Sequence, residues 1–167
     1  MKQYVIKAVR QAALFLLFFA AVRIATDLMR RPTLPARQAA QTLTTISGGK
    51  VDLSEASRQG AVLVYFWGSW CSICRHTSPA VQELAQDGVP VVSVALRSGS
   101  PGDVAGYLKD KGWDFPAVND ENGKLAAAWG IKATPTVIIL KDGEIAHSTV
   151  GISRYWDLRI RLWMAGM

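Results

Sequence analysis

Two cysteines spaced as Cys-X-X-Cys are the residues of this chain best suited to do chemistry. Cys71 and Cys74 end an apolar run of strand length, and residues 62–74 read V-L-V-Y-F-W-G-S-W-C-S-I-C. We predict that a helix begins at the cysteines. Its unpaired backbone N–H groups and the positive end of its dipole would then favour the thiolate form of Cys71. Cys74, three residues on, would share a helical face with Cys71, within disulfide reach. The pair is therefore predicted to exchange disulfides.

A zinc site and a structural disulfide are the alternative uses of this spacing. A zinc site needs further Cys or His ligands, and the only histidines, His76 and His147, do not form a second ligand pair at the usual spacing. We therefore predict no metal and no other cofactor. A disulfide that closes so small a loop constrains little of the unfolded chain, so stability is a weak reason for it.

The cysteine segment resembles the active site of thioredoxins. It is closer to that of the membrane-tethered, TlpA-like or suppressor-of-copper-sensitivity-like thioredoxin-fold proteins of bacterial envelopes. The resemblance covers roughly residues 42–164, and further segments match the family in order and spacing. These are Pro79, at the kink of the active-site helix, Ala133-Thr134-Pro135-Thr136, at the cis-proline loop, Gly143, between the last two strands, and residues 44–53 with Gly60, at the N-terminal addition of the TlpA branch. The resemblance implies an α/β fold with a thioredoxin-like mixed central sheet flanked by helices, and an N-terminal membrane anchor helix.

The site residues are assigned from thiol chemistry and from this resemblance. We predict that Cys71 attacks a client disulfide as a thiolate and that Cys74 resolves the mixed disulfide. The resemblance implies a cis bond before Pro135, which would place the Thr134 backbone beside the sulfurs, where an extended client peptide could pair with it. Trp70 is expected to shield one flank of the sulfurs. The predicted catalytic residues are thus Cys71, Cys74 and Pro135, and the predicted client-binding residues are Trp70 and Thr134.

One position departs from thioredoxin. Where thioredoxin has a buried aspartate two residues before the tryptophan of the strand, this chain has Tyr65. The carboxylate that assists proton transfer at the resolving cysteine is therefore absent from that position. Ser72 and Ile73 also replace the Gly-Pro of thioredoxin, and residues between the cysteines alter the reduction potential.

A copper-binding or metallochaperone module is the alternative function. Envelope copper proteins combine two cysteines with a distant histidine, a role that His147 could fill. Their cysteines are usually spaced by three residues rather than two, and the cis-proline segment would then have no purpose. Disulfide exchange with protein clients is therefore favoured, more as a reductase than as an oxidase, since the resemblance favours reduction.

The net charge of +6 is located in one part of the chain. Residues 1–37 hold seven Lys or Arg and one Asp, whereas residues 38–167 hold twelve of each sign. No basic run with interleaved aromatic residues occurs in the remainder, so nucleic-acid binding is not expected.

The N-terminal segment has the pattern of a signal anchor. Eleven apolar residues, 12–22, follow Lys2, Lys7 and Arg10 and precede Arg23. The run is shorter than the ~20 residues of a usual span, but 5–25 would suffice if the flanking charged side chains extend to the interfaces. We predict an uncleaved anchor at 1–29 rather than a cleaved signal peptide, a tether at 30–41 and a thioredoxin-like domain at 42–167.

The flanking charges do not decide the orientation. The resemblance implies a single-pass protein of the inner membrane, with a monomeric periplasmic domain, protein dithiol or disulfide clients and a membrane electron donor or acceptor.

Strands and helices are predicted to alternate through the domain. Strands are expected at 61–67, 89–96, 115–118, 136–140 and 145–150, and helices at 72–86, 101–111, 123–129 and 153–164. Ser100 is the expected N-cap of the second helix, and Asp142-Gly143 suits a tight hairpin turn. Trp156, Ile160 and Trp163 share one face of the last helix and are expected to pack in the core, with a membrane-facing role of Trp163 as the alternative.

Overall fold

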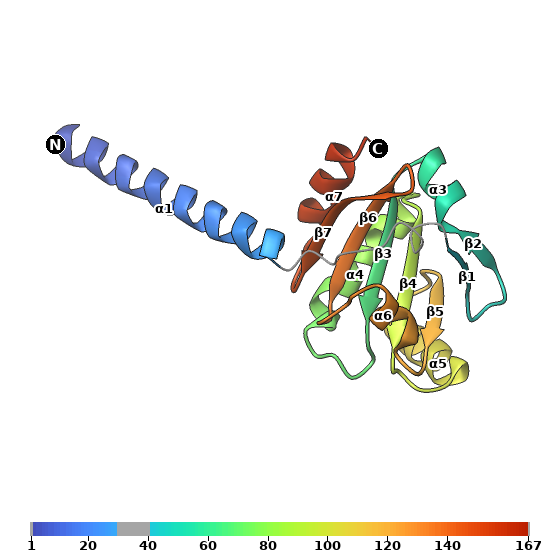
Figure 1. The fold of residues 1–167 in the computed structure, drawn as a ribbon. Helices are drawn as coiled ribbons and strands as arrows, with labels where there is room; N and C mark the ends of the chain where they lie inside the picture. The colour runs from blue at the N-terminus through green and yellow to red at the C-terminus, as the bar shows by residue number, and fades with distance from the viewer. Residues whose placement is uncertain (1, 30–40, 167) are drawn as a thin grey trace. The chain divides into compact units, whose positions relative to one another are not determined.

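The computed structural model describes residues 2–29 and 41–166 (Figure 1). The chain divides into two compact units, Met1–Arg31 and Pro32–Met167. The first unit contains helix α1 (Lys2–Met29), whose side chains are exposed from residue 11 to residue 22. None of the helices in the described residues has both the length and the hydropathy needed to cross a membrane. Residues 30–40 of the predicted tether lie outside the described residues.

A mixed five-stranded sheet forms the centre of the second unit (Figure 1). Its strand order is β5-β4-β3-β6-β7, with β3 parallel to β4, β4 parallel to β5, and β6 antiparallel to both β3 and β7. The strands are β3 (Val62–Trp67), β4 (Val91–Leu96), β5 (Ala117–Asp120), β6 (Thr136–Lys141) and β7 (Glu144–Val150). All six residues of β3 are buried, as expected for an uninterrupted apolar strand covered on both faces. The predicted thioredoxin-like sheet is thus confirmed.

Two hydrophobic cores, one on each face of the sheet, hold the helices in place. Successive side chains of a strand point to opposite faces of the sheet, so the side chains of β3 divide between the two cores. Leu63, Tyr65 and Trp67 pack in the core formed with α4 (Cys74–Gln86), α5 (Pro101–Lys111) and α7 (Tyr155–Met164). The other core holds the alternate β3 residues together with side chains of α3 (Leu53–Gln59), α6 (Lys124–Ala128) and the antiparallel pair of β1 (Thr42–Thr44) and β2 (Lys50–Asp52).

The structure confirms the helix cap and the hairpin turn that were predicted from the sequence. Ser100 caps α5, with its side chain accepting a hydrogen bond from the Asp103 N–H and the Asp103 carboxylate accepting one from the Ser100 N–H. The Ser100 hydroxyl, which donates to the Asp103 carboxylate over 2.8 Å, and the Ser100 N–H hold the pKa of this carboxyl below its usual value. Asp142 and Gly143 both have positive φ, 52° and 79°, in the turn between β6 and β7. Helix α3 was not predicted, although Asp52 accepts a hydrogen bond from the Glu55 N–H as its N-cap.

The expected burial of the last helix was wrong in its choice of face. Trp156, Ile160 and Trp163 are 72%, 55% and 74% exposed, whereas Leu158 and Leu162 are buried. Both sets recur at helical spacing, so periodicity alone cannot tell which set faces the sheet.

Substitutions on the two faces of α7 are expected to differ sharply in their effect on stability. Leu158→Ala should lower the free energy of unfolding by about 2–5 kcal/mol, because it removes buried apolar atoms and leaves a cavity. Trp163→Ala should change it by about 0.5 kcal/mol or less, because the indole is exposed. Urea unfolding of the two variants measures the difference. Equal losses would contradict the observed orientation of α7.

Candidate active site

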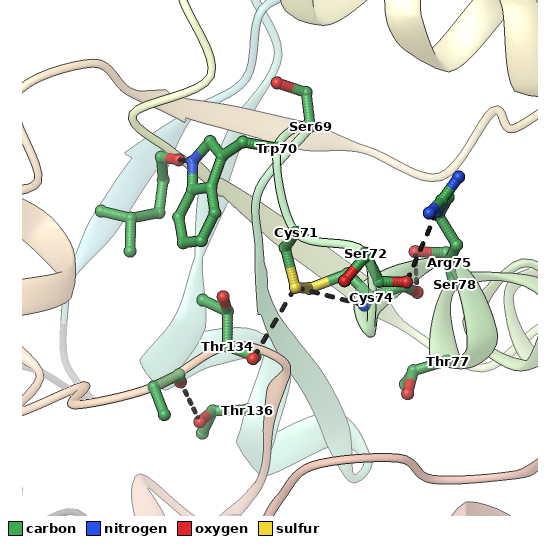
Figure 2. Close-up of a disulfide and its surroundings, with 12 residues drawn as sticks. Ser69, Trp70, Cys71, Ser72, Cys74, Arg75, Thr77, Ser78, Thr134 and Thr136 are labelled. Carbon is green, nitrogen blue, oxygen red and sulfur yellow. Dashed lines mark hydrogen bonds between the residues drawn. A yellow bond between two sulfur atoms is a disulfide. The ribbon is translucent and has the colours of Figure 1, made fainter.

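Cys71 lies between the end of β3 and the start of α4, and Cys74 is the first residue of α4. The two cysteines are joined in a disulfide, with Cα atoms 5.3 Å apart (Figure 2). Two backbone N–H groups donate the hydrogen bonds that hold the turn between strand and helix. The Cys71 N–H donates to the Gly68 carbonyl over 3.0 Å, and the Ser69 N–H donates to Ser98 Oγ over 2.9 Å. Cys71 is 6% exposed and Cys74 2%. Both cysteines are therefore buried, and Cys71 is slightly the more exposed residue of the pair.

The helix begins later than the sequence suggested. Helix α4 starts at Cys74 rather than at residue 72, so Cys71 precedes the first helical turn. The Cys74 N–H nevertheless donates to Cys71 Sγ over 3.2 Å, and Figure 2 shows this contact. A donor aimed at sulfur stabilises negative charge there, since hydrogen bonds to the charged form of a group favour that form. The arrangement thus suits a thiolate at Cys71 once the disulfide is reduced.

The loop before β6 brings Thr134 and Pro135 to the same sulfur. The Thr134–Pro135 peptide bond is cis, as the resemblance implied. The Thr134 carbonyl oxygen lies 3.7 Å from Cys71 Sγ and approaches it from a different side than the Cys74 N–H (Figure 2). The loop is anchored by Thr136 Oγ1, which donates to the Ala133 carbonyl, and by the Gly151 N–H, which donates to the Pro135 carbonyl.

Trp70 contributes an exposed aromatic surface next to Cys71. Its indole Nε1 donates to the Leu96 carbonyl over 2.9 Å, while 59% of the residue remains exposed. Ile73, between the two cysteines, is also exposed. The indole lies against Gly68, where a Cβ would come within 2.6 Å of Trp70 Cε2. The absence of a side chain at residue 68 therefore lets Trp70 lie where it does.

Gly68→Ala is expected to displace the Trp70 indole and so tests the predicted role of Trp70 as a client-binding residue. The added methyl group cannot fit beside the ring in its present place, so the indole should lose its hydrogen bond to Leu96. We expect KM for a protein disulfide to rise about threefold to tenfold with little change in kcat, as for the loss of a binding contact. A matched Gly106→Ala variant, whose Cβ would have no neighbour within 4 Å, serves as the control. A fall in kcat with an unchanged KM would contradict the predicted role of Trp70 in client binding.

Tyr65 occupies the position of the missing aspartate and contacts the active-site helix. Its side chain is fully buried, and its hydroxyl lies 2.9 Å from Ser78 Oγ and 3.3 Å from the Cys74 carbonyl oxygen. Burial raises the pKa of Tyr65, so the phenol stays neutral. Tyr65 was predicted only as the replacement of the aspartate, and Ser78 was not predicted as a residue of the site. Ser78 lies four residues after Cys74 and therefore on the same helical face, and this spacing was the signal that pointed to Ser78.

The histidines considered for metal binding do not join the cysteines in a cluster. His76 is exposed on α4, and His147 lies on β7 opposite Ile139 of β6. Across residues 2–29 and 41–166, no group of three or more His, Cys, Asp or Glu side chains could hold a metal ion.

Comparison with known proteins places these features in a family. The AhpC/TSA family matches residues 35–148. The chain is 42% identical over 153 residues to a "Thioredoxin-like protein" of Haemophilus influenzae, covering 92% of this chain and 91% of the relative. It is 41% identical over 107 residues to a "Thiol:disulfide interchange protein DsbE homolog" of Paracoccus denitrificans, covering 62% of this chain and 59% of the relative. Among solved structures, StoA from Bacillus subtilis matches with a TM-score of 0.65 and 27% identity, covering 76% of this chain and 98% of StoA.

Proposed function

Because this chain belongs to the AhpC/TSA family and is a thioredoxin-like thiol–disulfide oxidoreductase, we propose that it reduces disulfides of protein clients through Cys71 and Cys74 of its W-C-S-I-C segment. The observation that carries the proposal is the hydrogen bond from the Cys74 N–H to Cys71 Sγ. This hydrogen bond supplies a donor to the sulfur of Cys71, the more exposed cysteine of the pair, where the attacking thiolate is needed.

In the proposed reaction, two electrons pass from the dithiol to the client. The Cys71 thiolate attacks one client sulfur, forming a Cys71–client disulfide and releasing the other client sulfur as a thiolate. Cys74 then loses its proton to solvent, and its sulfur attacks Cys71 Sγ. This second step releases the reduced client and leaves the Cys71–Cys74 disulfide, as in the structure.

Three further residues are proposed to hold the client during this exchange. Thr134 and Pro135 lie in the loop that reaches Cys71 Sγ, and the Thr134 backbone is proposed to pair with an extended client segment. Trp70 is proposed to contact client side chains, because its ring is exposed next to the sulfur that attacks. The resemblance to the TlpA-like proteins supports these roles.

The direction of electron flow is tested by the reduction potential of the Cys71/Cys74 couple. We propose a reductase that is recharged by a membrane electron donor. A potential near about −270 mV, together with reduced thiols in cells, is the expected result. A potential near about −120 mV, together with a stable disulfide in cells, would instead identify a donor of disulfides.

We further propose that the N-terminal unit attaches the protein to the inner membrane by a single pass, in which the charged side chains beside the short apolar run extend to the interfaces, and that the catalytic domain lies in the periplasm. The apolar side chains of residues 12–22 are exposed along α1, and Lys and Arg residues flank them on both sides. The full chain should then remain in the membrane fraction after alkaline extraction, and its domain should be open to protease in spheroplasts. Leu16→Arg/Leu17→Arg should release the protein into the extract, because charge inside an apolar segment opposes insertion. Complete extraction of the unsubstituted chain would contradict the anchor.

A further inference from the structure

We propose that the hydroxyl groups of Tyr65 and Ser78 are positioning groups for thiol exchange, which hold Cys74 so that its backbone N–H stays on the sulfur of Cys71. This inference rests on the proposed function, because it concerns how that site is kept in order. It assigns a role to Tyr65, at the position where thioredoxin carries a carboxylate, and to its partner Ser78.

Three oxygen atoms meet beneath the first residue of α4. Ser78 Oγ donates to the Cys74 carbonyl oxygen over 3.0 Å, and the Tyr65 hydroxyl lies 3.3 Å from the same oxygen. The two hydroxyl oxygens are 2.9 Å apart. Tyr65 comes from the central strand β3 and Ser78 from the second turn of α4, so the contacts tie the strand to the start of the helix.

Burial makes these contacts costly to lose. Tyr65 and Ser78 are both fully buried, and a buried hydroxyl group without a partner carries a free-energy penalty. The two hydroxyl protons are both used when Tyr65 donates to Ser78 Oγ and Ser78 donates to the Cys74 carbonyl. They are also both used when Ser78 donates to Tyr65 and Tyr65 donates to that carbonyl. In either arrangement the chain of hydrogen bonds ends on Cys74.

Cys74 transmits this constraint to the attacking sulfur. Its carbonyl accepts from the hydroxyl pair, while its N–H donates to Cys71 Sγ over 3.2 Å. Both groups belong to one residue at the first position of α4, so a shift of its backbone moves the N–H away from the sulfur. Pro79 has no N–H to donate to the carbonyl of Arg75 four residues before it, so one hydrogen bond of α4 is missing directly after Cys74. The hydroxyl pair thus adds restraint where the helix is weakened.

The two hydroxyl groups act by positioning the Cys74 backbone and not by carrying charge. A carboxylate at residue 65 would place a negative charge below the cysteines, whereas the buried phenol is neutral. Ring contacts with Phe115 fix the orientation of Tyr65 in the core, with centroids 6.2 Å apart. A rigid neutral donor of this kind can order the Cys74 backbone without opposing a thiolate at Cys71.

The test compares Tyr65→Phe and Ser78→Ala with the unsubstituted full chain after reduction. The readout is the rate of alkylation of Cys71 across pH, resolved by peptide mass. We expect the apparent pKa of Cys71 to rise by about 0.5–1 pH unit in each variant, which is about threefold to tenfold slower alkylation below the pKa. The double variant should shift by less than the sum, since both hydroxyls act through one carbonyl. Tyr107→Phe, which removes a hydroxyl from the ring that stacks on Trp67, should leave the pH profile unchanged.

Two outcomes separate failure of this inference from failure of the proposed function. If the variants lower the urea midpoint of unfolding but keep the pH profile of Cys71, the hydroxyl pair is merely structural and the inference is overturned. If the unsubstituted protein itself fails to reduce a protein disulfide, the proposed function is wrong whatever the variants do. If Tyr65→Phe does not fold, Ser78→Ala alone still decides, because it removes one of the two hydroxyl groups that reach the Cys74 carbonyl and the hydrogen-bond partner of the other.

Discussion

Cys71→Ser should reduce the rate of insulin disulfide reduction by about a thousandfold or more, to the background of the assay reductant. A serine hydroxyl is not ionised near neutral pH and does not attack disulfide sulfur, so the first exchange step has no nucleophile. The rate is measured with the full chain and dithiothreitol as the electron source. Cys74 is the only other cysteine in the sequence, and it is more deeply buried than Cys71.

The control for this substitution is the stability of the variant. The lost disulfide closes a loop over a sequence separation of only three residues, so its removal should change the unfolding midpoint little. Turnover by Cys71→Ser at half the unsubstituted rate or more would contradict the assignment of the nucleophile.

Cys74→Ser should stall the enzyme after its first step rather than prevent that step. Cys71 can still attack, and the backbone N–H of residue 74 is unchanged by the substitution. No second sulfur is then present to resolve the intermediate. The protein should therefore accumulate as a mixed disulfide with its client, visible as a mass increase under non-reducing conditions. Multiple-turnover insulin reduction should fall by about a hundredfold or more.

The pair of serine variants distinguishes the two sulfurs. Only Cys74→Ser should trap a client, and only in stoichiometric amount, because each molecule attacks once. Trapping by Cys71→Ser instead would mean that the two roles are reversed. The trapped proteins, identified from cells, would also name the client class.

Much of the site was predictable because its signals are local. An uninterrupted apolar strand, a tight turn and two cysteines at helical spacing define where β3 ends and α4 begins, and the structure agrees to within two residues at the helix start. The cap at Ser100 and the turn at Asp142 also depend on neighbouring residues alone. Such features need no knowledge of tertiary contacts.

The remaining features depend on contacts between distant residues. The pairing of Tyr65 with Ser78 joins positions thirteen apart on a strand and a helix, so nothing in the local pattern distinguishes it from ordinary core packing. The orientation of α7 is decided by which side chains fit against the sheet, and Leu158 and Leu162 do so rather than the larger Trp156 and Trp163. Helix α3 was missed because seven residues are too few to show a clear helical period.

The most direct test of the account is a pH titration of the Cys71 thiolate in the reduced full chain, by ultraviolet absorbance with Cys71→Ser as the reference. The hydrogen bond from Cys74 and the adjacent start of α4 predict a pKa below about 7.5, within the range of reactive cysteines. A pKa of about 8.5 or above, that of an ordinary free thiol, would contradict the account.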